Sequence, residues 1–317
     1  MTTFDDIKNP LKLGSESISH RIIQGPLAGI SCSAFRKVVS KYGHPALTFS
    51  EMLSAKSIVH LSQDRMHRYL HIDPDESKVM CQLSGQNAKD IGDAIQRVLG
   101  HGFFGFDINA GCPMPKIRKE RCGSWWVEHL DELCCMLATV RQRFPDVLLG
   151  VKVRLSTQQN LSAWVKRIES TGVDYIIVHG RAWYQHYETP CRLEAIGEVV
   201  QQASIPIIGN GDVHDHQSLV AMLDQGVDAV MIARATIGHP ELPKRLLRCQ
   251  EGKPDQQISY QYFCEHLSAL ALLIPEKVAI AQSLRWLESY LGIKPIAEYT
   301  TLNCLDLFFD RLVDQLD

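Results

Sequence analysis

The chain has 317 residues, which is enough for one large domain with a small appendage or for two ordinary domains. Hydrophobic residues make up 45% of the sequence, and this share excludes an intrinsically disordered chain. The formal net charge is -3 and the sequence pI is near 6.5, so any contact with nucleic acid must come from a local basic patch.

Ten cysteines are scattered along the chain without the C-x-x-C spacing of zinc sites, and the N-terminal segment lacks the apolar core of a signal peptide. We therefore expect free thiols, no bound metal and a location in the reducing cytoplasm. The longest strongly apolar stretch covers residues 269–274, far short of the roughly 18 residues of a membrane span. We expect no membrane association and a monomeric protein.

Eight short runs of β-forming residues recur between segments of helix length. Successive runs are mostly about 25 to 40 residues apart, which leaves room for a crossover helix each time and favours a parallel sheet. The runs are 22–24, 47–50, 79–83, 106–109, 149–153, 175–179, 207–209 and 229–232. Eight such units predict an α/β fold of the (β/α)8 barrel type. The weak alternation over residues 11–18 is consistent with a lid or hairpin under this barrel.

A polar stretch at residues 251–255 contains a Gly and a Pro and separates the last barrel helix from a tail with a different pattern. Apolar residues in the tail recur at helical spacing over residues 263–274, 280–291 and 305–316. Pro275, Gly292 and Pro295 interrupt these runs. We predict a catalytic barrel over residues 1–250 and a small all-helical domain over residues 255–317.

Polar residues follow the predicted strands at their C-terminal ends, where barrel enzymes build their active sites. Any one of them could simply cap a strand, but polar groups at seven strand ends are costly unless something binds there. Asn210, Gly211, Asp212, Ala233 and Arg234 follow the last two strands, where barrels commonly bind phosphate. The sequence therefore predicts a phosphate-bearing ligand.

A flavin is one ligand of this kind that needs a cation near the pyrimidine end of its ring, and the strand residue Lys152 is placed to supply it. Gln82 and His179 could form hydrogen bonds with the flavin ring or its ribityl chain. A flavin is therefore one candidate for the ligand at the barrel mouth.

The same stretches resemble the tRNA-dihydrouridine synthase family, and the resemblance covers nearly the whole chain. The most specific features are the Asn-x-Gly-Cys-Pro stretch at 109–113 and the His-Gly-Arg stretch at 179–181. Further matching stretches are Pro26–Gly29, Ser50–Met52, Gln82–Gly85, Val151–Arg154 and Gly209–Asp212. The resemblance implies an FMN barrel, NADPH as the reductant, tRNA as the substrate and a tail that helps to hold the tRNA. The pattern looks closest to the bacterial subgroup that modifies uridine 16.

By this resemblance, FMN contacts lie at strand ends all around the barrel. The expected cofactor residues are Pro26, Leu27, Ala28, Gln82, Lys152, His179, Asn210, Gly211, Asp212, Ala233 and Arg234.

Reduction of the uracil 5,6 double bond requires hydride from the flavin at C6 and a proton at C5. A cysteine thiol is protonated at pH 7 yet can release its proton. Cys112 follows a predicted strand end in a Gly-Cys-Pro turn, so we expect it to be the proton donor. Cys122 is a second candidate, because it belongs to the same loop.

The target base must leave the folded RNA to reach a flavin. Residues 116–121 form the densest basic cluster of the chain, and residues 181–187 offer aromatic faces next to a cation. The residues expected to contact uridine or tRNA are Asn109, Lys116, Arg154, Arg181 and Tyr187.

Two other functions fit parts of the sequence. An FMN barrel acting on a small molecule such as dihydroorotate would use related chemistry, but it would need neither the helical tail nor the basic cluster. A catalytically silent tRNA-binding protein is indicated by the bulky Trp125–Trp126 pair. The intact Cys112 and flavin contacts argue against that alternative.

Overall fold

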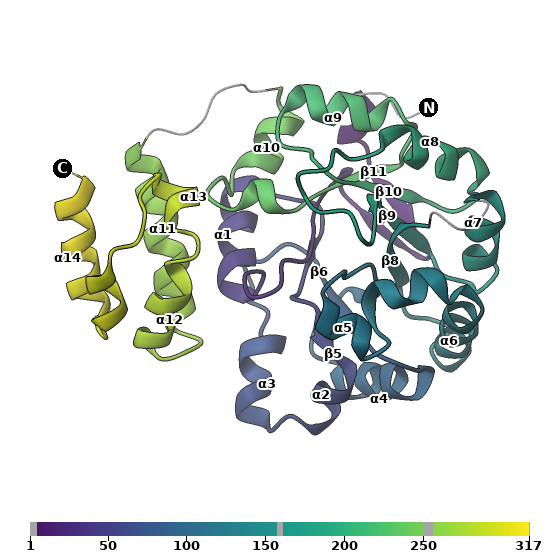
Figure 1. Ribbon diagram of the computed structural model, residues 1–317, viewed down its shortest axis with the longest axis horizontal. Helices are drawn as coiled ribbons and strands as arrows, with labels where there is room; N and C mark the ends of the chain where they lie inside the picture. Colours follow the sequence, from purple (N-terminus) through teal and green to yellow (C-terminus); the bar gives the residue numbers. More distant parts are fainter. Residues whose placement is uncertain (1–4, 157–160, 250–255, 317) are drawn as a thin grey trace.

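A closed parallel barrel surrounded by helices dominates the computed structural model, which describes residues 5–156, 161–249 and 256–316 (Figure 1). The barrel strands are β3 (Ile22–Gln24), β4 (Thr48–Phe49), β6 (Val79–Ser84), β7 (Gly105–Ala110), β8 (Leu149–Leu155), β9 (Tyr175–Ala182), β10 (Ile207–Asn210) and β11 (Ala229–Ile232). These are the eight predicted strands, with β8 and β9 extending two to three residues beyond the predicted ends.

The strands pair in parallel in the order β3-β11-β10-β9-β8-β7-β6-β4. A parallel bridge between Ile23 and Leu47 joins the two ends of this order, and a short strand β5 (Leu53–Ser54) adds to the pairing of β6. Because every strand runs in the same direction, all C-terminal ends open on one mouth. The predicted (β/α)8 barrel is confirmed.

Helices with one apolar face cover the outside of the barrel. They are α1 (Ser33–Gly43), α2 (Ala55–His60), α3 (Gln63–Leu70), α4 (Ala88–Val98), α6 (Leu130–Arg143), α7 (Leu161–Glu169), α8 (Leu193–Gln202), α9 (His216–Leu223) and α10 (Leu242–Leu247). In α4, the Asn87 side chain caps the first turn by accepting from the Asp90 backbone N–H at 2.8 Å. The same helix buries Ile91 and Ile95 against the sheet.

An antiparallel hairpin closes the bottom of the barrel. It consists of β1 (Leu11–Leu13) and β2 (Glu16–Ile18), preceded by a 3-10 helix η1 (Asp5–Lys8). Leu13 and Ile18 are buried in one cluster with Met80 and Tyr175, which point inward from the strands. The hairpin expected over residues 11–18 is therefore confirmed.

The segment between β7 and α6 is more regular than expected. The basic residues 116–121, predicted as a loop, begin as a short helix α5 (Pro115–Lys119), and a 3-10 helix η2 (Gly123–Glu128) follows. Pro115 favours this start because its missing N–H would be unpaired at the first helical position in any case. A third 3-10 helix, η3 (Arg234–Thr236), follows β11 at the mouth.

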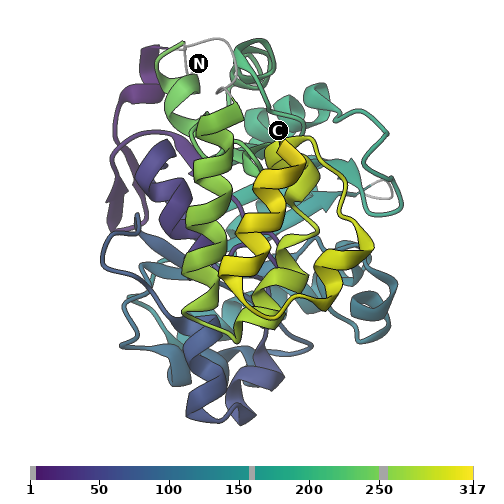
Figure 2. The same cartoon turned by 90° about the vertical axis from the view of Figure 1, so that its left-hand side faces the viewer.

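The tail folds into helices that pack together on one side of the barrel (Figures 1 and 2). They are α11 (Gln256–Ala271), α12 (Glu276–Ser283), α13 (Leu287–Leu291), a 3-10 helix η4 (Ala297–Thr301) and α14 (Leu305–Leu316). The continuous helical run expected over 280–291 is wrong, because the chain turns between α12 and α13. That turn lays the Trp286 ring flat on His266, with centroids 4.1 Å apart.

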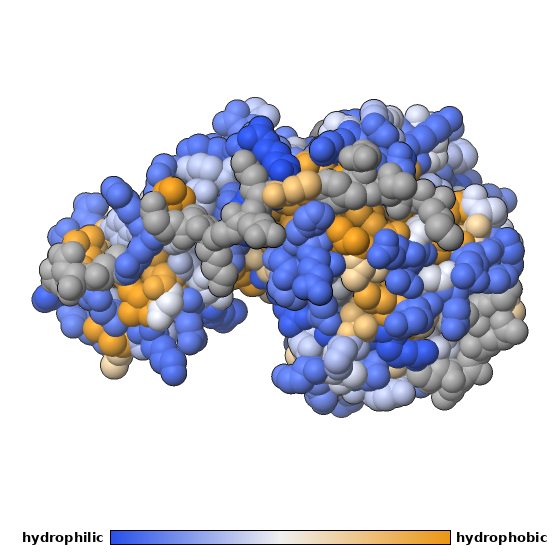
Figure 3. All heavy atoms as spheres, turned by 90° about the horizontal axis from the view of Figure 1, so that it is seen from above, coloured by the Kyte–Doolittle hydropathy of each residue, from blue (hydrophilic) through white to orange (hydrophobic). Residues whose placement is uncertain are grey.

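Tail and barrel meet mainly along α1 and α11. Cys32 and Ala34 at the start of α1 belong to the same apolar cluster as the tail helices. The Lys41 ammonium pairs with Glu265 of α11 at 2.8 Å. From above, the two parts appear as separate lobes with a notch between them (Figure 3). The predicted boundary at 251–255 lies outside the described residues.

Among the residues that the structure describes, no helix is both long enough and apolar enough to cross a membrane.

Candidate active site at the barrel mouth

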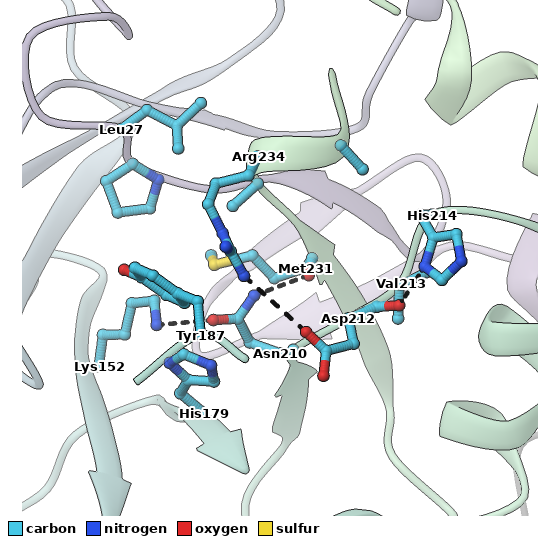
Figure 4. A pocket seen from close by; sticks show the side chains of 14 residues that line it. Leu27, Lys152, His179, Tyr187, Asn210, Asp212, Val213, His214, Met231 and Arg234 are labelled. Carbon is cyan, nitrogen blue, oxygen red and sulfur yellow. Dashed lines mark hydrogen bonds and ion pairs between the residues drawn. The ribbon is translucent and has the colours of Figure 1, made fainter. Parts of the chain in front are cut away.

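A cavity of about 430 Å³ opens among the C-terminal ends of β8 to β11 (Figure 4). Its lining combines one buried cationic residue from a strand, polar residues from the neighbouring strands and a cation at the rim. The lining residues are Pro26, Leu27, Lys152, His179, Tyr187, Asn210, Gly211, Asp212, Val213, His214, Met231, Ala233, Arg234 and Ala235. This size and composition are typical of a small-molecule or cofactor site.

Lys152 supplies positive charge in the depth of the cavity. Its ammonium donates to the Asn210 side-chain oxygen at 2.8 Å, and the Asn210 amide in turn donates to the Met231 carbonyl at 2.9 Å. Burial lowers the pKa of Lys152 to about 8, and the nearby Arg154 acts in the same direction. At pH 7 the side chain therefore remains charged, and it is held in one position.

His179 is neutral, and its protonation can be deduced from its neighbour. The Arg181 guanidinium lies 3.1 Å from Nε2 of His179, and because a guanidinium can only donate, Nε2 must accept. Burial and four surrounding cations hold the pKa of His179 well below its usual range. The remaining proton therefore resides on Nδ1, where it is available to a bound ligand.

The loop after β10 lines the cavity with backbone that few residues adopt, and it is the candidate anion cradle of the site. Gly211 has φ +134, and a Cβ there would come within 2.6 Å of the Cys191 sulfur. Asp212 follows in the left-handed region with φ +56, and its carboxylate accepts from Arg181. Arg234, at the start of η3, lies at the cavity rim with nearly half of its side chain exposed. A phosphate group of a flavin nucleotide fits this arrangement of glycine backbone and arginine.

Tyr187 lies over this cavity. Its ring is half exposed, stacks on the Arg234 guanidinium at 3.6 Å and faces the His179 ring at 6.4 Å, nearly in parallel. Figure 4 shows the ring close to Lys152 and His179. A planar aromatic face is thus presented at the opening, where an extruded base could stack.

Cys112 lies on the turn that follows β7, outside the lining of the cavity. Its backbone N–H donates to the Asn109 side-chain oxygen at 2.9 Å, and its carbonyl accepts from Ser124 of η2 at 2.9 Å. Burial raises the pKa of the Cys112 thiol, while the charges of Arg154 and Lys152 oppose that rise. The thiol is therefore protonated at neutral pH, as a proton donor requires.

Cys122, the second candidate, has a different environment. Its side chain is buried, and its thiol points to the Glu120 carbonyl at 3.3 Å. Burial raises the pKa of Cys122 to about 11. This thiol gives up its proton less readily than a proton donor should, so Cys112 is the better candidate.

The structure brings nine of the predicted cofactor residues together around one cavity. Ala28 is exposed, and Gln82 is fully buried below the mouth, so neither belongs to the lining. Val213, His214, Met231 and Ala235 line the cavity without having been predicted. A signal for Met231 was present, since it alternates with Val230 along β11 and so points into the barrel.

Two of the predicted substrate residues are used inside the protein. Arg154 is 2% exposed and donates to the Gly111 and Ala182 carbonyls at 3.0 Å each. Arg181 is 1% exposed and pairs with Asp212. Both guanidinium groups brace the loops of the mouth, and Lys116 on α5 is the exposed cation of the predicted set.

The basic cluster is partly neutralised. Arg118 pairs with Glu128 at 2.6 Å and lies over the Trp183 ring at 3.6 Å. Trp125 stacks on His129 with centroids 3.5 Å apart, and Trp126 is buried. The Trp125–Trp126 pair, which belongs to η2, therefore packs into the same apolar cluster as Leu130 and Leu133 of α6 and does not line the cavity.

Comparison with known proteins shows that the chain matches one protein family. The dihydrouridine synthase family model matches residues 23–304. The probable tRNA-dihydrouridine synthase 1 of Synechocystis is 32% identical over 270 residues, covering 82% of this chain and 75% of that protein. The tRNA-dihydrouridine synthase B of Escherichia coli K12 is 31% identical over 234 residues, covering 73% of this chain and 72% of that protein.

Solved structures with the same architecture are more distant in sequence. Morphinone reductase in complex with tetrahydroNAD superimposes with a TM-score of 0.58 at 15% identity, covering 79% of this chain and 93% of that one. A variant of NCR from Zymomonas mobilis superimposes with a TM-score of 0.59 at 16% identity, covering 80% of this chain and 94% of that one. At such low identity these matches support the barrel fold alone.

Proposed function

Since the chain belongs to the dihydrouridine synthase family, we propose that it is an FMN-dependent enzyme that reduces a D-loop uridine of tRNA to dihydrouridine, with NADPH as the reductant. One observation carries the proposal for this chain. A protonated thiol, Cys112, lies on the strand-end turn beside a cavity that has a cation at its base and a phosphate cradle at its rim.

The flavin would be held by side chains that the structure already orients. Lys152 would face the pyrimidine end of the ring, and His179 would donate from Nδ1. Gly211 and Arg234 would hold the phosphate. When bound and reduced, this group supplies hydride to C6 of the uracil.

Cys112 completes the reduction by giving its Sγ proton to C5. The 5,6 double bond is lost, one C–H bond forms at each carbon, and the thiolate regains a proton from solvent. Arg154 and Lys152 oppose the burial effect on the pKa of Cys112, and both therefore stabilise the thiolate that the step leaves behind. We assign Asn109, which flanks this turn, to the uridine-binding part of the site, while Arg154 braces the turn through the Gly111 carbonyl.

Exposed groups around the mouth would receive the tRNA. Tyr187, Tyr184 and Met114 all expose half or more of their side chains. Lys116 and Lys119 present positive charge on α5. A uridine extruded from the D-loop would stack on Tyr187, while these cations contact the phosphate backbone.

We also propose a division of labour and a position in the tRNA. Residues 1–250 form the catalytic barrel, and residues 255–317 help to hold the tRNA. The support for uridine 16 is the resemblance of the 178–187 loop and of the tail around Trp286 to the bacterial subgroup that modifies that position. Ten free thiols support a reducing, cytoplasmic environment.

The direct test uses purified protein, NADPH and unmodified tRNA. We expect a flavin absorbance spectrum and dihydrouridine at position 16, detected by mass spectrometry at each D-loop position. Dihydrouridine at another position would overturn the assignment of uridine 16 alone. Bound flavin that oxidises or reduces dihydroorotate or an enoate, without any tRNA product, would replace the proposal with a small-molecule oxidoreductase.

A further inference from the structure

A continuous chain of hydrogen bonds runs through the barrel interior to the turn of Cys112. The Gln82 amide nitrogen donates to the Asp107 carboxylate at 2.7 Å. The Asn109 amide nitrogen donates to the Gln82 oxygen at 2.9 Å. The Asn109 oxygen accepts from the backbone N–H groups of Gly111 at 3.2 Å and Cys112 at 2.9 Å.

Strand register explains why these residues meet. Asp107 and Asn109 are two residues apart on β7, so both side chains point into the barrel. Gln82 is the register partner of Asp107 on β6, and Lys152 is the register partner of Asn109 on β8. Asp107 and Gln82 are fully buried, and Asn109 is 8% exposed.

The chain has a direction that its two ends impose. An ionised Asp107 can only accept, so Gln82 must turn its NH2 group toward it and its oxygen toward Asn109. At the other end, two backbone N–H groups require the Asn109 oxygen. If both amides were reversed, the Asn109 NH2 group would face these two donors and leave them unpaired, which is costly in a buried place. The two ends thus select the same arrangement.

We propose that Asp107 is a positioning residue for the reduction: through Gln82 and Asn109 it orients the backbone of Cys112, and with it the thiol that donates the proton. The effect on catalysis rests on the proposed function, whereas the orientation of Cys112 by Asp107 does not depend on it. Burial raises the pKa of Asp107 to about 7, and the Gln82 hydrogen bond and the Lys152 charge oppose this rise. When the carboxyl is protonated, it still has an oxygen that can accept from Gln82, and the two backbone N–H groups at Asn109 fix the direction of the chain.

Three variants test the chain. Asp107→Leu keeps a branched side chain of similar shape but accepts no hydrogen bond, and Gln82→Met breaks the chain one link later. Asp107→Asn loses the charge but keeps an oxygen that can accept from Gln82. Flavin absorbance and thermal unfolding establish that each variant is folded.

The first readout is the rate at which iodoacetamide alkylates Cys112 in flavin-loaded protein, measured by peptide mass spectrometry relative to exposed Cys135 on α6. We expect Asp107→Leu and Gln82→Met each to change this ratio about tenfold, since each removes a hydrogen bond to a charged or buried partner. The double variant should change the alkylation ratio no more than either single variant does, because both substitutions break the same chain of hydrogen bonds. Asp107→Asn should have an alkylation ratio close to that of the wild-type protein.

The second readout is the reoxidation of reduced flavin by tRNA, which we expect to slow about tenfold or more in Asp107→Leu, because a misplaced donor is inefficient. Reduction of the flavin by NADPH should change much less. Unchanged alkylation in the single variants, additive effects in the double variant or failure of Asp107→Asn to recover would overturn the proposal. If wild-type protein does not reduce tRNA, the proposed function fails, and the alkylation ratio still decides the positioning role.

Discussion

The Nη2 atom of Arg181 donates to both carboxylate oxygens of Asp212, at 2.7 and 2.6 Å, across the ends of β9 and β10. Asp212 has a left-handed backbone, and the same carboxylate accepts from the Cys191 backbone N–H at 2.9 Å. The pair therefore holds the loop of the candidate anion cradle in shape, and it also compensates one negative charge next to the position proposed for the phosphate.

Replacing Arg181 should weaken flavin binding. In Arg181→Met, the Asp212 carboxylate loses its nearest cation and repels the phosphate more strongly, so we expect FMN affinity to fall about tenfold and the free energy of unfolding to fall by about 2 kcal/mol. Fluorescence titration of the flavin and urea denaturation measure the two effects. Arg192→Met, at an exposed position nearby, is the control, and equal affinities in the two variants would contradict this role.

The charge of Lys152 should set the reduction potential of the flavin. Lys152→Met removes the cation that would stabilise negative charge on the reduced ring, so we expect the midpoint potential to fall by on the order of 50 mV. A xanthine oxidase titration against a reference dye measures this potential. Lys119→Met removes an exposed cation on α5 and should leave the potential where it is; a drop of equal size there would show a general charge effect.

Acid should destabilise the protein through His266. Burial lowers the pKa of His266 to about 3, whereas in the unfolded chain a histidine takes up its proton below about 6.5. Acid therefore favours the unfolded state between these two values, and stability falls as the pH drops through this window.

The matching variant is His266→Phe, which keeps a ring to stack on Trp286. Between pH 7 and pH 5.5, wild-type protein should lose about 1 kcal/mol more unfolding free energy than this variant. Urea denaturation at the two pH values gives the comparison, with exposed His186→Gln expected to behave as wild type. An equal loss in wild type and His266→Phe would exclude His266 as the cause.

The contact between barrel and tail depends on Gly238. Its φ is +85, and a Cβ there would come within 2.0 Å of the Ser289 carbonyl oxygen. Gly238→Ala should therefore push α13 away and cost about 3 kcal/mol. Gly292→Ala has the same backbone strain with nothing near the added methyl group, and it should cost only about 1 kcal/mol. Melting temperatures that fall equally in both variants would show that the contact is unimportant.

The barrel could be predicted from the sequence because each buried parallel strand is a short apolar run with a helix-length segment after it. Gly211, Asp212 and Arg234 could be placed in one site for the same reason, since strand ends meet at the mouth. The break after α12 could not, because residues 280–291 have continuous helical spacing. The turn brings Trp286 onto His266 of α11, a contact between distant segments that the spacing does not reveal.

Hydrogen bonds between distant segments also could not be predicted from the sequence. Arg154 and Arg181 are cations at strand ends, and nothing in their spacing distinguishes a substrate contact from a brace. The carbonyls of Gly111 and Ala182 occupy Arg154, and Asp212 occupies Arg181. Asp107 lies within the predicted strand 106–109, and its role could not be predicted because it depends on the orientation of the Gln82 amide on the neighbouring strand.

The most direct measurement is a single-turnover experiment in which prereduced protein is mixed with unmodified tRNA and flavin reoxidation is followed. In Cys112→Ala we expect reoxidation to slow by about 100-fold or more, as is typical for loss of a general acid, with dihydrouridine formation slowed in step. Cys122→Ala should stay within about threefold of wild type, because its buried thiol takes no part in proton donation. Wild-type rates in Cys112→Ala, or a comparable loss in Cys122→Ala alone, would contradict the assignment of Cys112 as the proton donor.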